Sequence, residues 1–303
     1  MNYYNKIKEQ LINNEVYKRV KDYSKNRSDL ETNYNVGKLL VEAQGGEGRS
    51  EYGNKLIKEY SKKLTNELGR GYSSTNLKYM RKFYLLKKGQ SVIDQFNVSW
   101  THYIFLLSLN NVNEINYYLK MVDKYNLSVR ELRNRIKSKE YERLDDRTKE
   151  KLVEKQETKI ADLTKNPILI RNSYNYQEIS EKILKQLILE DISNFMKELG
   201  DGFSFIDDEY KIKIGDRYNY IDLLLFNIKY NCYVVVELKT TELKKEHIGQ
   251  LEIYMNYIDK HIRTINQDKT IGIIICKKDK CFVMEYCSDD RIYMTTYELE
   301  KKV

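Results

Sequence analysis

Hydrophobic residues recur every three or four positions through the first half of the chain, the spacing of one face of a helix. Residues 54–68 follow this pattern with lysines on the opposite face, and Gly69 and Gly71 end the run. A second stripe, Leu77, Met80 and Phe83, begins after Ser73 or Ser74, either of which suits a helix N-cap. The same periodicity predicts further helices, at residues 34–41, 100–107, 111–125 and 128–155.

Two helices joined by a short glycine turn have the outline of a helix-turn-helix, whose second helix can enter a DNA groove. The predicted second helix would then present Lys78, Arg81 and Lys82 to phosphate. Many plain helical hairpins share this outline, so both interpretations stay open. Arg130 and Arg133 on the charged segment 128–155 are further candidates for phosphate contacts, although charged helix faces are usually only solvated.

The second half of the chain has a different pattern. An amphipathic helix at 177–199 precedes short β-rich segments, and a central one reads Val-Val-Val. The predicted strands are 203–206, 210–214, 218–226, 232–239, 270–276 and 281–286, with a helix at 245–259. We therefore predict a helical domain at 1–155, a linker at 156–176 around Pro167, and a mixed α/β domain at 177–303.

Charge differs between the two halves. Residues 1–150 carry 29 Lys and Arg against 19 Asp and Glu, whereas residues 151–303 carry 24 against 26. A basic half beside a slightly acidic one favours a nucleic-acid-binding module joined to something else. A solvated helical surface in a lysine-rich protein explains the same numbers equally well.

Several classes of protein are excluded by the pattern. No apolar run approaches the roughly 18 residues of a membrane span, and the first residues lack the apolar segment of a secretory signal. The four cysteines form no C-x-x-C pair, so we expect free thiols in the cytoplasm rather than a zinc site. No Walker loop or dinucleotide fingerprint is present, which argues against a nucleotide cofactor.

The candidate chemistry lies in residues 220–254. Glu237 and Lys239 are two apart on a predicted strand and share a face, and a hairpin turn centred near residue 229 would place Asp222 opposite residue 236. Charges in so apolar a strand are costly unless they are paired or bind a metal. Two adjacent carboxylates suit a hard cation such as Mg²⁺, and a lysine beside them can offset charge on a phosphate. The alternative is an edge-strand Glu–Lys pair without function.

The ordered set Asp222, Glu237-x-Lys239 and then Gln250 matches the PD-(D/E)XK nuclease pattern, and the likeness reaches beyond it. The chain resembles the YhcG-type family of bacterial proteins, which join a helical N-terminal domain to a PD-(D/E)XK nuclease domain. The residues that carry the resemblance are Tyr72-Ser73, Asn76-Leu77, Trp100, Ser128–Leu132, Glu198–Gly200, Tyr220–Leu224, Val236–Lys239, Gly249-Gln250 and Thr270–Ile273.

This resemblance implies a restriction-endonuclease-like sheet and metal-dependent hydrolysis of nucleic-acid phosphodiesters. Asp222 and Glu237 would hold Mg²⁺ or Mn²⁺, Lys239 would position the water or stabilise the transition state, and Gln250 would support the site. Where the family helix carries a glutamate, this chain has Lys185. Glu181, one turn earlier on the same face, is the expected substitute ligand.

The expected partner is nucleic acid, most simply double-stranded DNA held by the basic half. PD-(D/E)XK enzymes often act as dimers, so the resemblance also implies a homodimer, although no heptad in the sequence supports one. Two other interpretations stay open. One is a nucleic-acid-binding or scaffold protein whose nuclease site has lapsed, and the other is an RNA-specific or structure-specific nuclease of branched substrates. The resemblance places such a protein in bacteria, phages or mobile elements.

Overall fold

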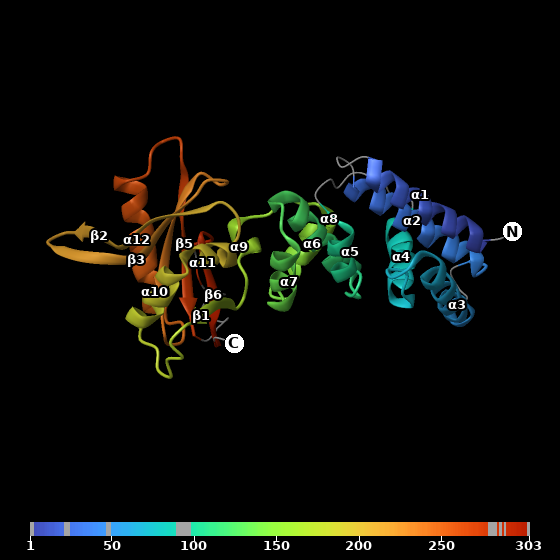
Figure 1. The fold of residues 1–303 in the computed structure, drawn as a ribbon. Helices are drawn as coiled ribbons and strands as arrows, with labels where there is room; N and C mark the ends of the chain where they lie inside the picture. The colour runs from blue at the N-terminus through green and yellow to red at the C-terminus, as the bar shows by residue number, and fades with distance from the viewer. Residues whose placement is uncertain are drawn as a thin grey trace. The chain divides into compact units, whose positions relative to one another are not determined.

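The computed structural model describes residues 3–20, 25–46, 50–88, 98–277, 284, 287 and 289–301. Packing divides the chain into two compact units, Met1–Tyr141 and Glu142–Val303, and each is described by itself. Figure 1 shows helices alone in the first unit and a mixed sheet flanked by helices in the second. The fold class predicted from the sequence, a helical N-terminal part followed by an α/β part with a restriction-endonuclease-like sheet, is confirmed.

In the first unit the first four helices share one core. Gly37 of α2 lies against α4, because a Cβ there would come 2.1 Å from the backbone oxygen of Met80. Buried Ile7, Leu40 and Leu64 fill the centre of this group. The helices are α1 Tyr3–Val20, α2 Lys25–Ala43, α3 Ser50–Leu68, α4 Ser74–Lys87, α5 Trp100–Leu106, α6 Val112–Tyr125 and α7 Val129–Lys137.

Side-chain caps set where several of these helices begin. The Ser73 hydroxyl accepts a hydrogen bond from the Asn76 N–H at 3.2 Å, as predicted for the N-cap of α4. The predicted single helix at 128–155 is wrong. It is two helices, α7 and α8 (Asp146–Glu154), because the backbone turns left-handed at Lys139 and Asp145 caps a new helix.

The second unit is built on a six-stranded sheet in the order β1-β6-β5-β4-β3-β2. Strands β2, β3 and β4 pair antiparallel, whereas β4, β5, β6 and β1 pair parallel. One core cluster packs α10 and α11 on one face, and another packs α12 on the opposite face. The elements are α9 Ile160–Leu163, β1 Ile168–Asn172, α10 Glu181–Glu190, α11 Ile192–Leu199, β2 Phe203–Ile214, β3 Arg217–Asn227, β4 Cys232–Leu238, α12 Lys245–His261, β5 Asp268–Cys276 and β6 Ile292–Lys301.

Several details differ from the sequence-based expectation. Residues 156–176, expected as a linker, contribute α9 and the edge strand β1, which pairs with β6. The amphipathic helix at 177–199 breaks at Asp191, and the two short strands after it are one strand, β2, with a bulge between Phe205 and Asp207. The predicted strand at 281–286 falls outside the described residues except for Met284, which is helical.

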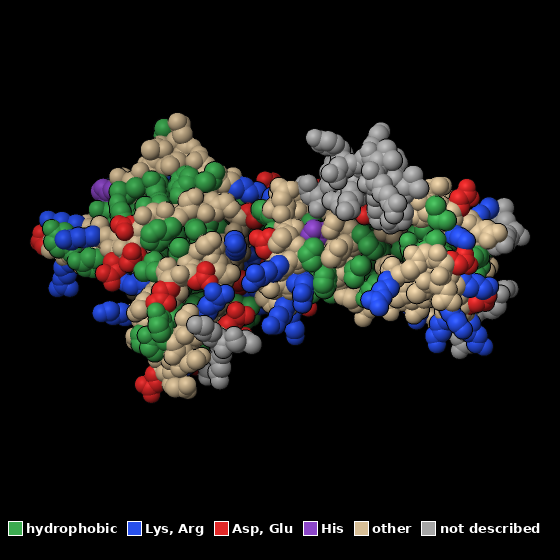
Figure 2. All heavy atoms as spheres, viewed as in Figure 1, with side chains coloured by type: hydrophobic (Ala, Val, Ile, Leu, Met, Phe, Trp, Pro, Cys, Tyr) green, Lys and Arg blue, Asp and Glu red, His purple; other side chains and the backbone are tan. Residues whose placement is uncertain are grey.

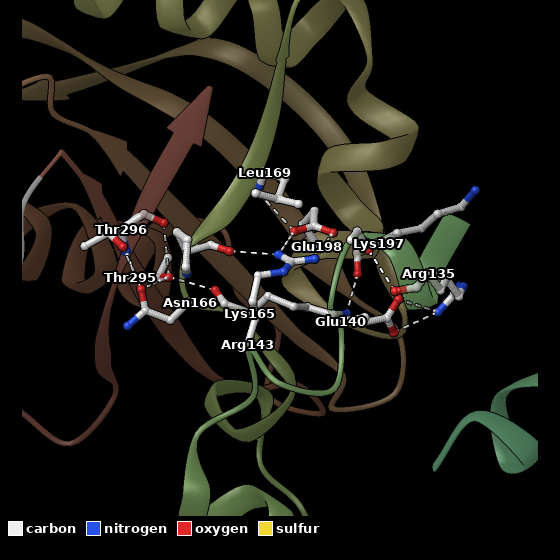
Figure 3. A network of polar contacts seen from close by, with 12 residues as sticks. Arg135, Glu140, Arg143, Lys165, Asn166, Leu169, Lys197, Glu198, Thr295 and Thr296 are labelled. Atoms are coloured by element: carbon white, nitrogen blue, oxygen red, sulfur yellow. Dashed lines mark hydrogen bonds and ion pairs between the residues drawn. The ribbon is translucent and has the colours of Figure 1, made fainter. Parts of the chain in front are cut away.

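A buried polar network ties β1 and β6 to α11 (Figure 3). Arg143 forms a two-pronged ion pair with Glu198, with Nη2 3.1 Å from Oε1, and Glu198 Oε2 also accepts the Leu169 N–H at 3.0 Å. The Thr295 hydroxyl donates to the Lys165 carbonyl at 2.8 Å. Because these bonds join α11 to the sheet, Glu198 has a structural role.

Two further findings concern membrane-spanning helices and the cysteines. Over the described ranges, no helix is both long enough and apolar enough to cross a membrane. Cys232, Cys276 and Cys287 are free thiols, whereas Cys281 lies outside the described residues.

Candidate active site

The site forms where the pairing of β3 with β4 ends. The last paired residues are Leu223 and Val236, and the next residue of β3 toward the tip of the β2–β3 hairpin is Asp222. Its carboxylate takes the place of a backbone partner, because Oδ2 accepts the Leu238 N–H at 2.9 Å. The Lys239 N–H donates to the Ile275 carbonyl of β5 at 2.8 Å, which holds this end of β4 in the sheet.

Three predicted site residues meet in one ion-pair cluster. Lys239 Nζ lies 2.8 Å from Glu237 Oε1 and 3.4 Å from Glu181 Oε2. The Glu237 and Lys239 side chains are 3% and 12% exposed, whereas Glu181 at the start of α10 is 46% exposed. The structure therefore brings Glu181, the expected substitute ligand, to the same lysine that pairs with Glu237.

Burial and neighbouring charge shift the acidic groups toward their neutral forms. Burial raises the pKa of Glu237 to about 7, the charge of Asp222 acts in the same direction, and Lys239 opposes them. Burial also raises the pKa of Asp222, against the Leu238 hydrogen bond and the charge of Lys239. Burial alone lowers the pKa of Lys239, but the hydrogen bond to Glu237 and the acidic neighbours raise it overall. Lys239 is thus a fixed cation beside two carboxylates that repel each other.

One oxygen of this cluster has no partner in the described structure. Glu237 Oε2 is buried and makes no hydrogen bond. No three His, Cys, Asp or Glu side chains of the described residues converge as a metal site, so the cluster offers two carboxylates, those of Asp222 and Glu237. Mg²⁺ keeps several waters and is commonly held by one or two carboxylates together with a substrate phosphate. The donor set therefore fits a Mg²⁺-type ion.

Lys185, the residue expected at the position of the family glutamate, has its own partner. Its Nζ lies 2.6 Å from Glu209 Oε1, and its charge also acts on Asp222. Glu209 has a left-handed backbone with φ of 51° and stands where a residue opposite Asp222 would pair. Sequence reasoning missed this ion pair, because an irregularity within β2 positions Glu209.

Gln250 lies on α12, as expected, but its contacts are local. Its side-chain amide donates to the Tyr254 hydroxyl at 2.9 Å, and none of the bonds described for the cluster includes it. His247, on the same helix, does interact with the cluster. Burial lowers the pKa of His247, and the charge of Lys239 lowers it further. Its only signal in the sequence is its place one turn before Gln250, so sequence reasoning missed it.

In the first unit, the three candidate cations of α4 line one cavity. Lys78, Arg81 and Lys82 border a hollow of about 190 Å³ together with Gln44, which follows α2, and residues of α3. Arg81 Nε donates to Gln44 Oε1 at 3.1 Å, and buried Gln44 is fixed in turn by its bond to the Leu40 carbonyl at 2.8 Å. Lys82 Nζ donates to the Leu107 carbonyl at 3.1 Å. These three side chains thus border one concave surface, and two of them also make hydrogen bonds within the unit.

The two candidate arginines of α7 lie elsewhere in the same unit. Arg130 and Arg133 are exposed, and the Arg133 guanidinium sits over the Phe105 ring, 5.2 Å from its centroid. Their neighbour Arg135 forms an ion pair with Glu140 within the same unit, with Nη1 2.9 Å from Oε1.

Comparison with known proteins agrees with the geometry. Residues 162–302 match the family model described as the YhcG PDDEXK nuclease domain, and residues 8–143 match the DUF1016 N-terminal domain. The chain belongs to the YhcG-type PD-(D/E)XK family. It is 28% identical over 279 residues to the protein named "Putative nuclease YhcG" of Escherichia coli (strain K12), covering 80% of this chain and 74% of that one.

Two solved structures also resemble part of this YhcG-type chain. A repair endonuclease from Pyrococcus abyssi is 20% identical with a TM-score of 0.30, over 41% of this chain and 49% of that one. The EndoMS–dsDNA2 complex is 19% identical with a TM-score of 0.28, over 43% and 48%. The matched part spans about half the length of each solved chain.

Membership of the YhcG-type family makes the chain a protein of the PD-(D/E)XK nuclease type, a class that generally uses divalent metals. The motif residues Asp222, Glu237 and Lys239 lie where the sheet brings β3, β4 and α10 together.

Proposed function

We propose that this chain is a metal-dependent endonuclease that hydrolyses DNA phosphodiester bonds, with the helical unit holding the nucleic acid. The observation that carries this proposal is Glu237 Oε2, a buried and unpartnered carboxylate oxygen beside Asp222 and the cation of Lys239. Such an arrangement is unfavourable in the free protein and becomes favourable when a divalent cation is bound.

In the proposed reaction, the oxygen of a water attacks phosphorus and the bond from phosphorus to the leaving oxygen breaks. Asp222 and Glu237 would hold Mg²⁺ or Mn²⁺, which when bound polarises the phosphate and makes a water more acidic. Lys239 is charged and cannot act as a base, so its role is to orient the attacking water and offset the charge that develops on the phosphate. Glu181 forms a second, longer ion pair with Lys239.

The basic first unit supports a DNA substrate. Lys78, Arg81 and Lys82 around one hollow, with Arg130 and Arg133 on α7, supply cations that can neutralise backbone phosphates. A second candidate function is a nucleic-acid-binding protein whose nuclease site has lapsed. Lys185 favours this alternative, because it brings a positive charge to Asp222 where the family has a glutamate.

Cleavage of supercoiled plasmid, linear duplex, single-stranded, branched DNA and RNA tests the proposal, each with Mg²⁺, Mn²⁺ or EDTA. We expect metal-dependent cleavage of DNA that is lost in Asp222→Ala and retained in Glu252→Ala, an exposed carboxylate of α12. Salt-sensitive binding without cleavage of any substrate would instead support the lapsed-site alternative. Cleavage of RNA but of no DNA substrate would show that the substrate class is RNA, while the proposed active site would still stand.

A further inference from the structure

The hairpin of β2 and β3 extends beyond the part of the sheet that β4 covers. Residues Tyr210–Ile214 pair with Arg217–Ile221, and the pairing of β3 with β4 begins only at Leu223. In Figure 1 this hairpin protrudes from the edge of the sheet, and in Figure 2 its tip carries Lys and Arg side chains beside hydrophobic ones. Each face of this hairpin therefore has its own surroundings.

One face of the hairpin is packed and the other is open. Ile212 and Ile221 are each no more than 1% exposed and belong to the core cluster under α12. Because side chains alternate along a strand, the residues of β2 and β3 at odd spacing from Ile212 and Ile221 point to the opposite face. These include Lys211, Lys213, Tyr218 and Tyr220, with Lys211 opposite Tyr220 and Lys213 opposite Tyr218 in the register.

The open face combines aromatic rings with unneutralised positive charge. Tyr218 and Tyr220 are 56% and 52% exposed, and Lys211 Nζ lies 3.9 Å from the Tyr218 ring centroid. Within the described chain, neither Lys211 nor Lys213 forms an ion pair. Exposed tyrosines beside free lysines are the components of a surface that stacks bases and binds the adjoining phosphates.

The open face lies next to the candidate active site along β3. Asp222 is two residues beyond Tyr220, directly before the paired residue Leu223, and Lys185 and Glu181 of α10 act on its pKa. Alternate residues of a strand are about 7 Å apart at roughly 3.4 Å per residue. The backbone positions of Tyr220 and Tyr218 therefore lie about 7 Å and about 14 Å from that of Asp222 along β3.

We propose that this face binds an unpaired strand of the nucleic-acid substrate beside the scissile phosphate, with Tyr218 and Tyr220 stacked on bases and Lys211 and Lys213 on phosphates. In an intact duplex, successive bases stack about 3.4 Å apart and cover each other's faces. Rings about 7 Å apart can each stack on a base only where the strand is unstacked. The inference rests on the proposed nuclease function and specifies its substrate: DNA with single-stranded character next to the cut.

Equilibrium binding of the full chain in EDTA tests this without cleavage. Fluorescent oligonucleotides of equal length would be used as a thymidine single strand, a blunt duplex and a duplex with a single-stranded flap. For Tyr218→Ala/Tyr220→Ala we expect at least about tenfold weaker binding of the single strand and the flap. Affinity for the blunt duplex should change less than about twofold, because the rings do not stack on its bases.

Matched variants separate stacking from charge and from misfolding. Tyr218→Phe/Tyr220→Phe keeps the rings and should retain affinity. Lys211→Ala/Lys213→Ala should lower the salt slope for the single strand by about 1.4, at about 0.7 for each phosphate contact. Lys229→Ala removes a lysine that lies over Tyr230 at the other end of β3, and should change nothing. Thermal unfolding checks that each variant is folded.

Two results would overturn the inference. One is unchanged single-strand affinity in the double alanine variant, and the other is an equal loss for the blunt duplex. Failure of the proposed nuclease function is a separate result, because it would be seen as wild-type protein that cuts no substrate with Mg²⁺ or Mn²⁺ while this binding pattern holds.

Discussion

Lys239 Nζ lies 2.8 Å from Glu237 Oε1, while the second oxygen of Glu237 is buried without a partner. The ion pair is therefore only half satisfied. A residue that serves stability alone would gain from a second hydrogen bond, since a buried acceptor without a hydrogen bond costs free energy. An open carboxylate oxygen beside Asp222 is what a cation-binding site requires before the cation arrives.

Removing either partner should stop catalysis without unfolding the protein. For Glu237→Ala and Lys239→Ala we expect plasmid cleavage with Mg²⁺ to fall by at least about a hundredfold, the scale of removing one group that stabilises the transition state. Duplex binding in EDTA should stay within about threefold of wild type, because neither side chain lies on the basic unit. Cleavage at wild-type rates in both variants would show that the site lies elsewhere.

The stability of the metal-free protein should depend on pH through Glu237. Its pKa is raised from 4.5 to about 7, so between those values the folded protein keeps a proton that the unfolded chain has released. Stability therefore falls as pH rises through this window and stays lower above it. Glu237→Gln cannot release this proton and should gain stability relative to wild type between pH 4.5 and 8, by about 1–3 kcal/mol.

Urea unfolding in EDTA at pH 4.5, 6 and 8 measures this difference. Glu252→Gln, on the exposed face of α12, controls for the loss of one carboxylate and should track wild type. A constant difference between Glu237→Gln and wild type across the three pH values would mean that Glu237 has an ordinary carboxyl pKa.

Much of the second unit could be predicted from the sequence, because its elements carry strong local signals. The pattern predicted β3, β4, α12 and β5 to within a few residues. It placed Asp222 opposite residue 236, whereas the register pairs Leu223 with Val236. The error is one residue, because Asn227 pairs with Cys232 and the turn therefore centres between 229 and 230.

Features that depend on tertiary packing could not be predicted. β1 is a five-residue edge strand whose place depends on β6 and on the Arg143–Glu198 pair. The contact of Glu181 with Lys239 joins a helix to a strand 58 residues away, and only the folded sheet brings them together. The open face of the hairpin had a visible signal, two Lys and two Tyr residues at period two leading to Asp222, but no sequence feature showed which face is covered.

The cavity of the first unit should contribute most of the duplex phosphate contacts. For Lys78→Gln/Arg81→Gln/Lys82→Gln we expect weaker binding of a blunt duplex and a salt slope lower by about 2–3, at about 0.9 for each phosphate that is no longer neutralised. Lys55→Gln/Lys58→Gln/Lys62→Gln is the matched control, since it removes three exposed charges of α3 that do not line the cavity. Equal salt slopes in the two triple variants would show that the cations of α4 do not contact DNA phosphates.

Lys185 should weaken divalent-metal binding, because its charge acts on Asp222 from the helix that faces the site. In Lys185→Gln this opposing charge is absent, and in Lys185→Glu a carboxylate replaces it beside Glu209, which can no longer form its 2.6 Å ion pair. We therefore expect Mn²⁺ affinity to rise several-fold in Lys185→Gln and further in Lys185→Glu, by the size of a partly screened charge interaction.

Isothermal titration calorimetry with Mn²⁺ measures the affinities of wild type, Lys185→Gln and Lys185→Glu directly, and it does not require a known substrate. Lys182→Gln removes an exposed lysine of the same helix that is not among the main charges acting on Asp222, so its affinity should match wild type. If Lys185→Glu bound Mn²⁺ no better than wild type, the residue at this position would not face the metal. Tighter binding accompanied by faster cleavage would instead show that Lys185 tunes an active nuclease to a lower metal affinity than a glutamate would give.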